Sequence, residues 1–365
     1  MQQGPVVSSA MNEPLVSVGM AVCNVERFLP EAIESVLAQT LSDFELIVVD
    51  FGSTDRSKEI AQAFAAKDSR VRVHQVSPCG LPEARNAAFR LARGRFFAVM
   101  DADDVCLPQR LQREVEFMEA HPEIGLLGGA TDWIDAQGRS LGVRSFPTED
   151  REIRSELTSR FPFCHPTILL RRATFEAIGG YRKAFVCGHD YDLGARIAEK
   201  SRCANLDQVV LQYRIHPHQI SLQRQRQQTL SKLATQAAAE RRAGGLADGL
   251  DLVDQITPSV LDQLGVPKDR VRSTLAADRR NWIRSMAAAG EYSAALETAS
   301  DLLRDHDGVE TWQIADLRLT MARLYWKQGR FFQSVVSAVA AVAERPLILG
   351  RPLKGLWPRA KAGQN

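Results

Sequence analysis

Three carboxylates stand close together directly after an apolar run. Residues 96–100 read FFAVM, and Asp101, Asp103 and Asp104 follow within four positions. The run has the length and composition of a strand that is covered on both faces. Side chains alternate along an extended strand, so Asp101 and Asp103 are expected to point to one side and Asp104 to the other. Two carboxylates that point together repel each other unless a cation, a shared proton or solvent compensates, and we favour a divalent cation.

An ordinary structural role also fits these carboxylates. Pro108 is typical of the first turn of a helix, and Asp103 or Asp104 would then cap that helix. Asp101 would simply be solvated at the end of its strand. The cluster by itself does not distinguish a metal site from a helix cap.

The elements that would position the cluster alternate between strands and helices. The pattern predicts strands at 15–22, 44–50, 71–76 and 96–100, and helices at 30–39, 55–66 and 81–92. This order indicates right-handed crossovers and a parallel sheet, whose ligands gather beyond the carboxyl ends of the strands. Asp50 and Asp101 both lie at such ends.

Composition and charge exclude several classes of protein. A chain of 365 residues with 45% hydrophobic content has room for one large domain and a smaller one. With 46 Lys and Arg against 44 Asp and Glu, the chain has no global attraction to nucleic acid. Six scattered Cys form no metal-binding pattern and favour a reducing cytosol. We expect a cytoplasmic chain without a membrane span or export signal, since no apolar run approaches ~20 residues.

Four segments in order carry a resemblance to a known family. They are VSVGMAVCN from Val16, FLPEAIESVLAQT from Phe28, FELIVVDFGSTD from Phe44 and GLPEARNAAFRLARGRFFAVMDADD from Gly80. This succession resembles the family 2 glycosyltransferases, inverting enzymes that use nucleotide-diphosphate sugars. Later segments through YRIHPHQIS extend the resemblance over residues 14–222. It implies an α/β GT-A fold with a mixed, mainly parallel sheet flanked by helices, followed here by a C-terminal all-α region.

The resemblance implies donor contacts for three residues. Asp50 corresponds to the acidic residue that hydrogen-bonds the nucleotide base, usually uracil, although a turn-forming Asp before Gly52 is the structural alternative. Arg85 and Asn86 correspond to residues near the donor pyrophosphate or ribose, and an exposed Arg on a helix face is the alternative for Arg85. Phe51 replaces a second Asp, so contacts to the base or ribose are expected to differ. A UDP- or dTDP-sugar is the expected donor.

The resemblance also implies a metal site. Asp103 corresponds to the metal ligand of the DxD motif, and Asp101 to a residue that reaches the ribose and the metal shell. His216 corresponds to a histidine that completes the metal or diphosphate site, with the nearby His218 as an alternative. The implied ion is Mn²⁺ or Mg²⁺, because carboxylate oxygens suit such ions and the leaving diphosphate accumulates charge.

Asp190, in the segment GHDYDL, corresponds to the catalytic base that takes the proton of the acceptor hydroxyl. The alternative is that Asp190 or Asp192 caps the helix that follows. Relatives commonly have an acidic residue where this chain has His189. The resemblance places His189 on the acceptor side of the site, together with Thr167 and Arg171.

The character of the sequence changes after residue 222. Residues 1–13 form a polar lead, 14–222 the catalytic domain, 223–245 a linking helix, and 246–344 a helical region. Segments 282–303 and 324–342 each contain a helix, a glycine and a second helix. They resemble tetratricopeptide-type hairpins, but a generic helical bundle that packs on the catalytic domain or pairs two subunits fits as well.

The tail at residues 345–365 has five Lys and Arg and no acidic residue. Basic residues alternating with Leu and Trp357 suit an anionic membrane surface. A loosely docked tail is the alternative, since three prolines prevent a continuous helix.

Together these features predict a metal-dependent inverting transferase for surface polysaccharides, with a saccharide or lipid-linked acceptor. A catalytically weakened domain that acts as a scaffold through its helical tail is the second hypothesis. A nucleotidyltransferase is less favoured, because a phosphate-binding loop rich in glycine and Lys or Arg is absent after the first strand.

Overall fold

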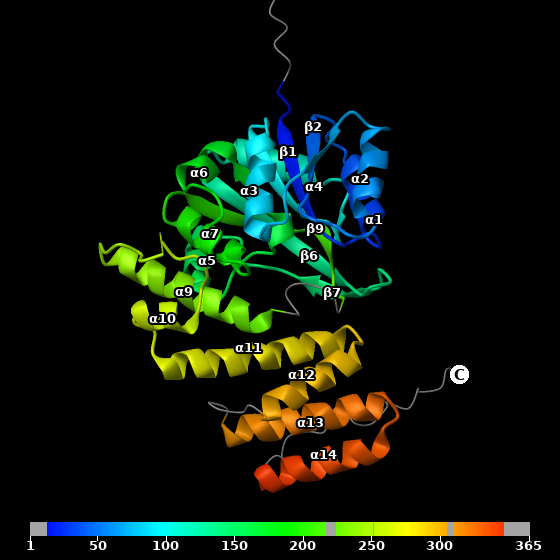
Figure 1. Cartoon of the computed structure of the whole chain (residues 1–365), viewed down its shortest axis with the longest axis vertical. Coiled ribbons are helices and arrows are strands. Elements are labelled where there is room, and N and C mark those ends of the chain that lie inside the picture. The colour runs from blue at the N-terminus through cyan, green and yellow to red at the C-terminus, as the bar shows by residue number, and fades with distance from the viewer. Residues whose placement is uncertain (1–12, 217–223, 251, 305–309, 347–365) are drawn as a thin grey trace, which may run out of the picture.

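The computed structural model describes residues 13–216, 224–250, 252–304 and 310–346. These residues form a sheet domain with helices on both faces, and a stack of helices that lies beside it (Figure 1). The lead at residues 1–12 and the tail from residue 347 onward lie outside the described residues, so the predictions for them are not addressed by the structure.

The sheet domain is built around four parallel strands, of which β1, β2 and β4 are buried on both faces and β3 is only partly buried. The strand order is β3-β2-β1-β4-β8-β6-β9-β5, and β7 pairs with β6. Strands β1, β2, β3 and β4 run parallel, and β8 joins β4 to β6 in antiparallel register. The bounds are β1 Val16–Val22, β2 Phe44–Asp50, β3 Val71–Gln75, β4 Phe96–Asp101, β5 Val105–Cys106, β6 Ile124–Ile134, β7 Ser140–Arg144, β8 Leu169–Arg171 and β9 Arg202–Arg214. The predicted mixed, mainly parallel sheet is confirmed.

Two separate hydrophobic clusters cover the two faces of the sheet. One cluster joins α1, α2 and α4 to the inner strands, and the other joins α3, α6 and α7 to the opposite face. The helices and the short 3₁₀ turn η1 span α1 Leu29–Leu37, α2 Ser57–Ala65, α3 Leu81–Leu91, α4 Arg110–Ala120, α5 Asp150–Leu157, η1 His165–Thr167, α6 Arg172–Ala177 and α7 His189–Ala198. Strands that are covered on both faces need continuous apolar runs, and such runs allowed these strands to be predicted from the sequence.

The predicted boundaries of the first seven elements agree with the structure within two residues. Differences of that size are usual where helix ends fray and strands fade into loops. The strand at β4 extends one residue further than predicted, so that Asp101 is its last residue.

The remaining helices form a stack that leaves the sheet domain (Figure 1). They are α9 Gln225–Ala243, α10 Pro258–Gln263, α11 Lys268–Ala288, α12 Tyr292–Arg304, α13 Thr311–Lys327 and α14 Phe331–Glu344. Helix α9 is the predicted linking helix and ends at Gly244. Gly290 and Gly329 lie at the two hairpin turns with φ of +81° and +73°, a conformation that favours glycine. Whether these hairpins are of the tetratricopeptide type stays a prediction.

The stack is attached to the sheet domain by a hydrophobic cluster of its own. Ala184 and Phe185, in the loop before α7, pack among Leu230 and Leu233 of α9 and Leu261 of α10. None of the described helices combines the length and hydrophobicity that a bilayer crossing requires.

A buried ion pair ties α4 to the strand that ends in Asp101. Arg110 Nε lies 2.9 Å from Glu114 Oε1, and both side chains are fully buried. Arg110 Nη2 also donates to the carbonyl of Val99 at 2.9 Å, two residues before Asp101. The ion pair therefore holds Arg110 against the end of β4.

Replacing Glu114 by Ala is expected to lower the free energy of unfolding by about 3–5 kcal/mol, because the buried charge of Arg110 would lose its partner. Chemical denaturation measures this change. Glu116→Ala is the matched control on the exposed side of the same helix, and it should stay within about 0.5 kcal/mol of the unaltered protein. Equal stabilities of the two variants would contradict the role given to the pair.

Candidate active site

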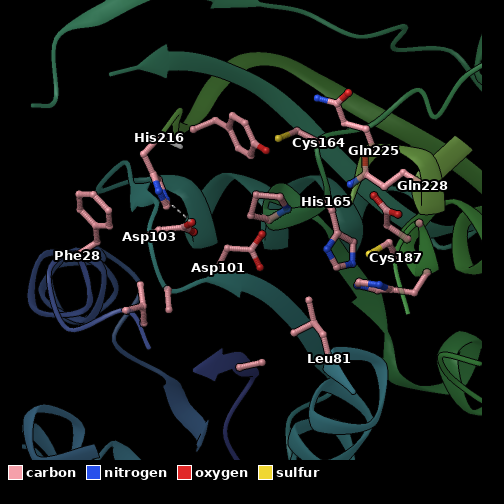
Figure 2. A pocket seen from close by; sticks show the side chains of 18 of the residues that line it. Phe28, Leu81, Asp101, Asp103, Cys164, His165, Cys187, His216, Gln225 and Gln228 are labelled. Carbon is pink, nitrogen blue, oxygen red and sulfur yellow. Dashed lines mark hydrogen bonds and ion pairs between the residues drawn. The ribbon is translucent and has the colours of Figure 1, made fainter. Parts of the chain in front are cut away.

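A cavity of about 1030 Å³ opens at the carboxyl ends of β1, β2 and β4. Such edges are where ligands bind in parallel sheets, and the volume is at the upper end of the range for ligand pockets. Figure 2 shows Phe28 and His216 on one side, Gln225 and Gln228 on the other, and Asp101 between them. The cavity therefore has room for one ligand group on each side of Asp101.

The three predicted carboxylates meet in one turn. Asp101, Asp103 and Asp104 each offer an oxygen, and these atoms all lie within 4.8 Å of one another. The strand ends at Asp101 and the chain turns at Ala102, so the extended strand expected through Asp104 is not formed. Asp101 and Asp103 nevertheless line the cavity while Asp104 is buried, which is the division of side chains that was expected. The capping alternative is wrong, since the helix α4 begins at Arg110 with Gln109 at its N-cap.

Arg214, the last residue of β9, fixes the shape of this turn. Its backbone N–H donates to Asp104 Oδ1 at 2.8 Å, and its Nε donates to the carbonyl of Asp103 at 2.8 Å. The guanidinium also pairs with Glu31 at 2.6 Å and lies over the ring of Phe28. The sequence analysis missed Arg214, although it stands two positions before His216 in the segment that carried the resemblance.

His216 reaches the same turn, and its Nε2 lies 3.0 Å from Asp103 Oδ2 (Figure 2). Asp104 Oδ2 is buried and has no hydrogen-bond partner among the described residues. Burial and then the neighbouring carboxylates raise the pKa of Asp104 well above its usual range. Burial also raises the pKa of Asp101, against the lowering effect of Arg85.

Crowded carboxylates beside an imidazole fit a divalent metal ion. An ion would compensate the burial and the mutual repulsion that raise these pKa values, and oxygen ligands with one nitrogen suit Mn²⁺ or Mg²⁺. Asp101, Asp103 and His216, the predicted metal residues, are therefore brought together, and Asp104 joins them.

Arg85 links the cluster to a buried polar network. It lies on α3 and is nearly buried, so the exposed-helix alternative is wrong. Its Nη2 donates to Asp101 Oδ1 at 2.7 Å, while Nη1 contacts the ring of His165. His165 Nε2 lies 2.9 Å from the hydroxyl of Tyr181. Burial and then the charge of Arg85 hold the pKa of His165 well below its usual value, which makes it a neutral ring. Sequence reasoning missed His165 and Tyr181.

Asp190 lies in the first turn of α7 and lines the cavity. The capping alternative is wrong for both aspartates, because Gly188 is the N-cap and Asp192 pairs with Arg196 at 2.7 Å. Asp190 Oδ1 accepts a hydrogen bond from the N–H of Tyr191 at 2.9 Å. Burial raises the pKa of Asp190, and its charge in turn raises the pKa of Asp101, so the two carboxylates share one electrostatic environment.

His189 lines the cavity beside Asp190, as the acceptor-side prediction requires of its position. Its ring packs edge-on against Tyr181 and His165, with centroids 5.4 and 5.5 Å apart. Burial lowers the pKa of His189 well below its usual value. His189 Nδ1 has no hydrogen-bond partner in the described part of the chain. A neutral imidazole with a spare nitrogen therefore lies next to the candidate base.

Four predicted site residues do not line the cavity, and three of them are Asn86, Thr167 and Arg171. The amide of Asn86 is used on both sides by the backbone of Tyr181, at 2.7 and 2.9 Å. The Thr167 hydroxyl is fully buried and bonds the carbonyl of Cys164 at 2.7 Å. Arg171 pairs with Phe96 at the start of β4, about 17 Å from Asp101 at 3.3 Å per residue. These three side chains hold the scaffold, and the geometry does not support their predicted ligand contacts.

Asp50 lies at the end of β2 as expected, but its side chain is buried. Its Oδ1 accepts from the N–H groups of Gly52 and Ser53 at 3.3 and 3.4 Å, which is the turn-forming role. Oδ2 has no partner within the described ranges. Phe51 lines the cavity in place of Asp50. The contact of Asp50 with a base therefore stays a prediction.

Asn24 shapes the end of the cavity that β1 and β2 form. It has a φ of +53°, and its Oδ1 accepts from the N–H groups of Thr54 and Asp55 at 2.8 and 3.3 Å. The two loops that follow β1 and β2 are thereby joined. Sequence reasoning missed Asn24, although a polar residue directly after the first strand was a usable signal.

Helices α9 and α11 supply the opposite end of the cavity. Gln225, Gln228, Thr229 and Lys232 come from α9, and Asp278 and Trp282 come from α11. Asp278 accepts hydrogen bonds from Lys232 at 2.7 Å and from Thr229 at 2.8 Å. Nothing in the sequence placed these helices against the site.

Comparisons with known proteins agree with the resemblance seen in the sequence. The family described as Glycosyl transferase family 2 matches residues 17–179. An uncharacterised glycosyltransferase of Methanocaldococcus jannaschii is 32% identical over 227 residues, which cover 60% of this chain and 77% of the relative. The O-antigen biosynthesis glycosyltransferase WbnJ of Escherichia coli is 30% identical, over 55% of this chain and 80% of its own.

The structure of residues 1–349 of S. aureus TarS in complex with UDP-GlcNAc has a similar fold. The TM-score is 0.50 with 17% sequence identity, and the match covers 92% of each chain. This likeness includes the helical region as well as the sheet domain, because it extends over nearly the whole chain.

Removing one carboxylate of the cluster is expected to weaken Mn²⁺ binding. In Asp103→Ala the affinity for Mn²⁺, measured by electron paramagnetic resonance of the free ion, should fall about 10-fold or more, since the cluster would lose charge and a ligand. The control is Asp207→Ala, which removes an exposed carboxylate on β9 outside the cluster. Unchanged affinity in Asp103→Ala would argue that the carboxylates hold no metal.

Proposed function

The chain is a glycosyltransferase of family 2, and from that membership we propose a metal-dependent inverting enzyme that uses a nucleotide-diphosphate sugar. The acceptor we propose is a saccharide or lipid-linked saccharide of a surface polysaccharide. The observation that carries this proposal is one cavity that joins the carboxylate cluster, His216 and Asp190. A weakened domain that serves only as a scaffold has no reason to keep this arrangement.

The donor nucleotide would occupy the end of the cavity at Cys23, Asn24 and Phe51. We favour a UDP-sugar or dTDP-sugar, and the fold neighbour TarS, which was solved with UDP-GlcNAc, is in line with that choice. The ring of Phe51 offers an apolar surface for a base, and the backbone around Asn24 supplies a rigid frame. Arg85 would face the diphosphate, because it lines the cavity and its Nε has no partner among the described residues.

Asp101, Asp103 and His216 would hold Mn²⁺ or Mg²⁺, with Asp104 beside them. Such an ion, when bound, neutralises the charge that accumulates on the departing diphosphate. Arg85 keeps Asp101 in place by their 2.7 Å ion pair. Arg214 keeps Asp103 and Asp104 in the turn, so the ligands are arranged before the donor arrives.

Asp190 would act as the base. The acceptor hydroxyl attacks the anomeric carbon on the side opposite the diphosphate, and its proton passes to the Asp190 carboxylate as the new C–O bond forms. The raised pKa of Asp190 makes it a stronger base than an ordinary aspartate. Because the bond to the diphosphate breaks on the other face, the configuration of the sugar inverts.

The acceptor would enter from the end formed by α9 and α11. Trp282 offers a flat apolar surface for a sugar ring, while Gln225, Gln228 and Asp278 offer polar groups for its hydroxyls. In this proposal the helical region is part of the acceptor site.

We also place the reaction in the cytoplasm, where nucleotide sugars and reduced thiols coexist. All six cysteines are free in the structure, which supports a reducing environment.

Donor hydrolysis and transfer by Asp190→Asn test this function. Incubation with a panel of UDP-, dTDP- and GDP-sugars should release nucleotide diphosphate only when Mn²⁺ or Mg²⁺ is present. Asp190→Asn should lower transfer by about 10²–10⁴-fold, because no base remains, while donor binding persists. In the unaltered enzyme the rate should fall as pH decreases through the raised pKa of Asp190, at a pH above the ordinary pKa of an aspartate.

The control for this experiment is Asp207→Asn, which should retain full activity. Metal-independent release, or full transfer by Asp190→Asn, would contradict the mechanism.

Trp282→Ala should raise the KM for acceptor about 10-fold and leave the metal-dependent hydrolysis of donor unchanged, because the ring lies at the end of the cavity away from the nucleotide. The control is Trp312→Ala on α13, which does not line the cavity. An unchanged KM in Trp282→Ala would remove α11 from the acceptor site without affecting the assignment of Asp190.

A further inference from the structure

Positive charge is concentrated at one end of the chain. Residues 317–365 contain nine Lys and Arg and a single acidic residue, Glu344. The whole chain has a net charge of only +2, so the residues before 317 are together net negative. An asymmetry of this kind indicates a terminal segment that meets a negatively charged partner.

The last described helix turns an apolar face outward. Phe331, Phe332, Val335, Val336 and Val339 are between 51% and 80% exposed. Their spacing places them on one side of α14. The opposite side packs on α13, where the Ser334 hydroxyl donates to the carbonyl of Ala322 at 2.8 Å. The helix is therefore held with its apolar side toward solvent, and such patches mark interaction surfaces.

The end of α13 extends this apolar face and surrounds it with cations. Trp326 is exposed, and its ring lies 4.8 Å from the ring of Phe331. Arg323, Lys327 and Arg330 are exposed nearby, on the last two turns of α13 and in the connection to α14. The one acidic residue of this region, Glu344, pairs with Arg318. We call Trp326, Phe331, Phe332, Val335, Val336 and Val339 the α14 surface.

We propose that the α14 surface docks on an anionic lipid bilayer. Phenylalanine and valine side chains would enter the boundary between headgroups and acyl chains, and Trp326 would lie at the headgroup level. The cations at Arg323, Lys327 and Arg330 would contact anionic headgroups. The apolar side chains would insert into the bilayer, and the surrounding positive charges would favour anionic lipids.

A second copy of the chain is a less suitable partner for this surface. A symmetric dimer brings the same patch of both subunits together, so two strongly cationic segments would face each other and repel. Nucleic acid would match the charge but would leave the valine and phenylalanine side chains without an apolar environment. A bilayer with anionic lipid satisfies both the apolar and the cationic part.

The position of the surface fits attachment at one end of the molecule. Helix α14 is the last layer of the stack and lies on the side away from the sheet domain (Figure 1). This inference does not depend on the donor or on the role of Asp190.

Vesicle flotation of the full chain tests the proposal. The protein should float with phosphatidylcholine vesicles that contain about 30% phosphatidylglycerol, and not with phosphatidylcholine alone. Phe332→Ser with Val339→Ser should weaken binding about tenfold, because two apolar side chains would no longer leave water. Lys327→Gln with Arg330→Gln should weaken binding and reduce its dependence on salt. Leu252→Ser is the control at an exposed leucine outside this surface, and it should bind as the unaltered protein does.

Three results would overturn the proposal. The first is absence of binding to anionic vesicles. The second is that Phe332→Ser with Val339→Ser binds as well as the unaltered protein. If deletion of residues 347–365 then abolished binding, the tail alone would be responsible. The third is a dimer in sedimentation equilibrium that the same two substitutions dissociate, which would assign the surface to a second copy. Thermal unfolding of each variant checks that its fold is retained, as expected for exposed positions.

Discussion

The repulsion among Asp101, Asp103 and Asp104 is the constraint on which the rest of the site depends. Three carboxylates in one turn would push the chain apart if nothing held them. The protein supplies the restraint from three directions: Arg214 binds the turn from β9, Arg85 binds Asp101 from α3, and Arg110 fixes the strand from below. Each of these arginines has its own acceptor, so the negative charge that remains is directed into the cavity.

The two aspartates of α7 show how local surroundings separate structural from chemical roles. Asp192 pairs with Arg196 and is almost fully buried, whereas Asp190 accepts a backbone N–H and lines the cavity. His165 and His189 line the same cavity, and burial keeps both rings neutral. They therefore add no positive charge that would lower the basicity of Asp190. A pocket rich in carboxylates and neutral imidazoles is suited to collect a cation and to accept a proton.

The parts of this arrangement that the sequence could predict are those set by local patterns. Buried strands and amphipathic helices are visible as apolar runs, and Asp103, Asp190 and His216 stand in segments whose order carried the family resemblance. The turn at Ala102 could not be predicted, because the same short sequence is compatible with an extended strand and with a turn. Arg214 could not be assigned, since its hydrogen bonds with the turn after β4 span more than a hundred residues. For the same reason Thr167 and Arg171 were interpreted as site residues. The Thr167 hydroxyl accepts from the distant N–H of Gly129, and Arg171 donates to the distant carbonyl of Ile124, so both serve the scaffold.

The packing of Ala184 and Phe185 against α9 and α10 has a consequence for the extent of the catalytic unit. Judged by the sequence resemblance alone, the catalytic unit would end near residue 222, and any helical tail could be joined there. The loop that leads to Asp190 at the start of α7 would then lose the hydrophobic contacts of Ala184 and Phe185. A unit that keeps these contacts includes α9 and α10, so the structural boundary of the catalytic unit lies inside the helical stack.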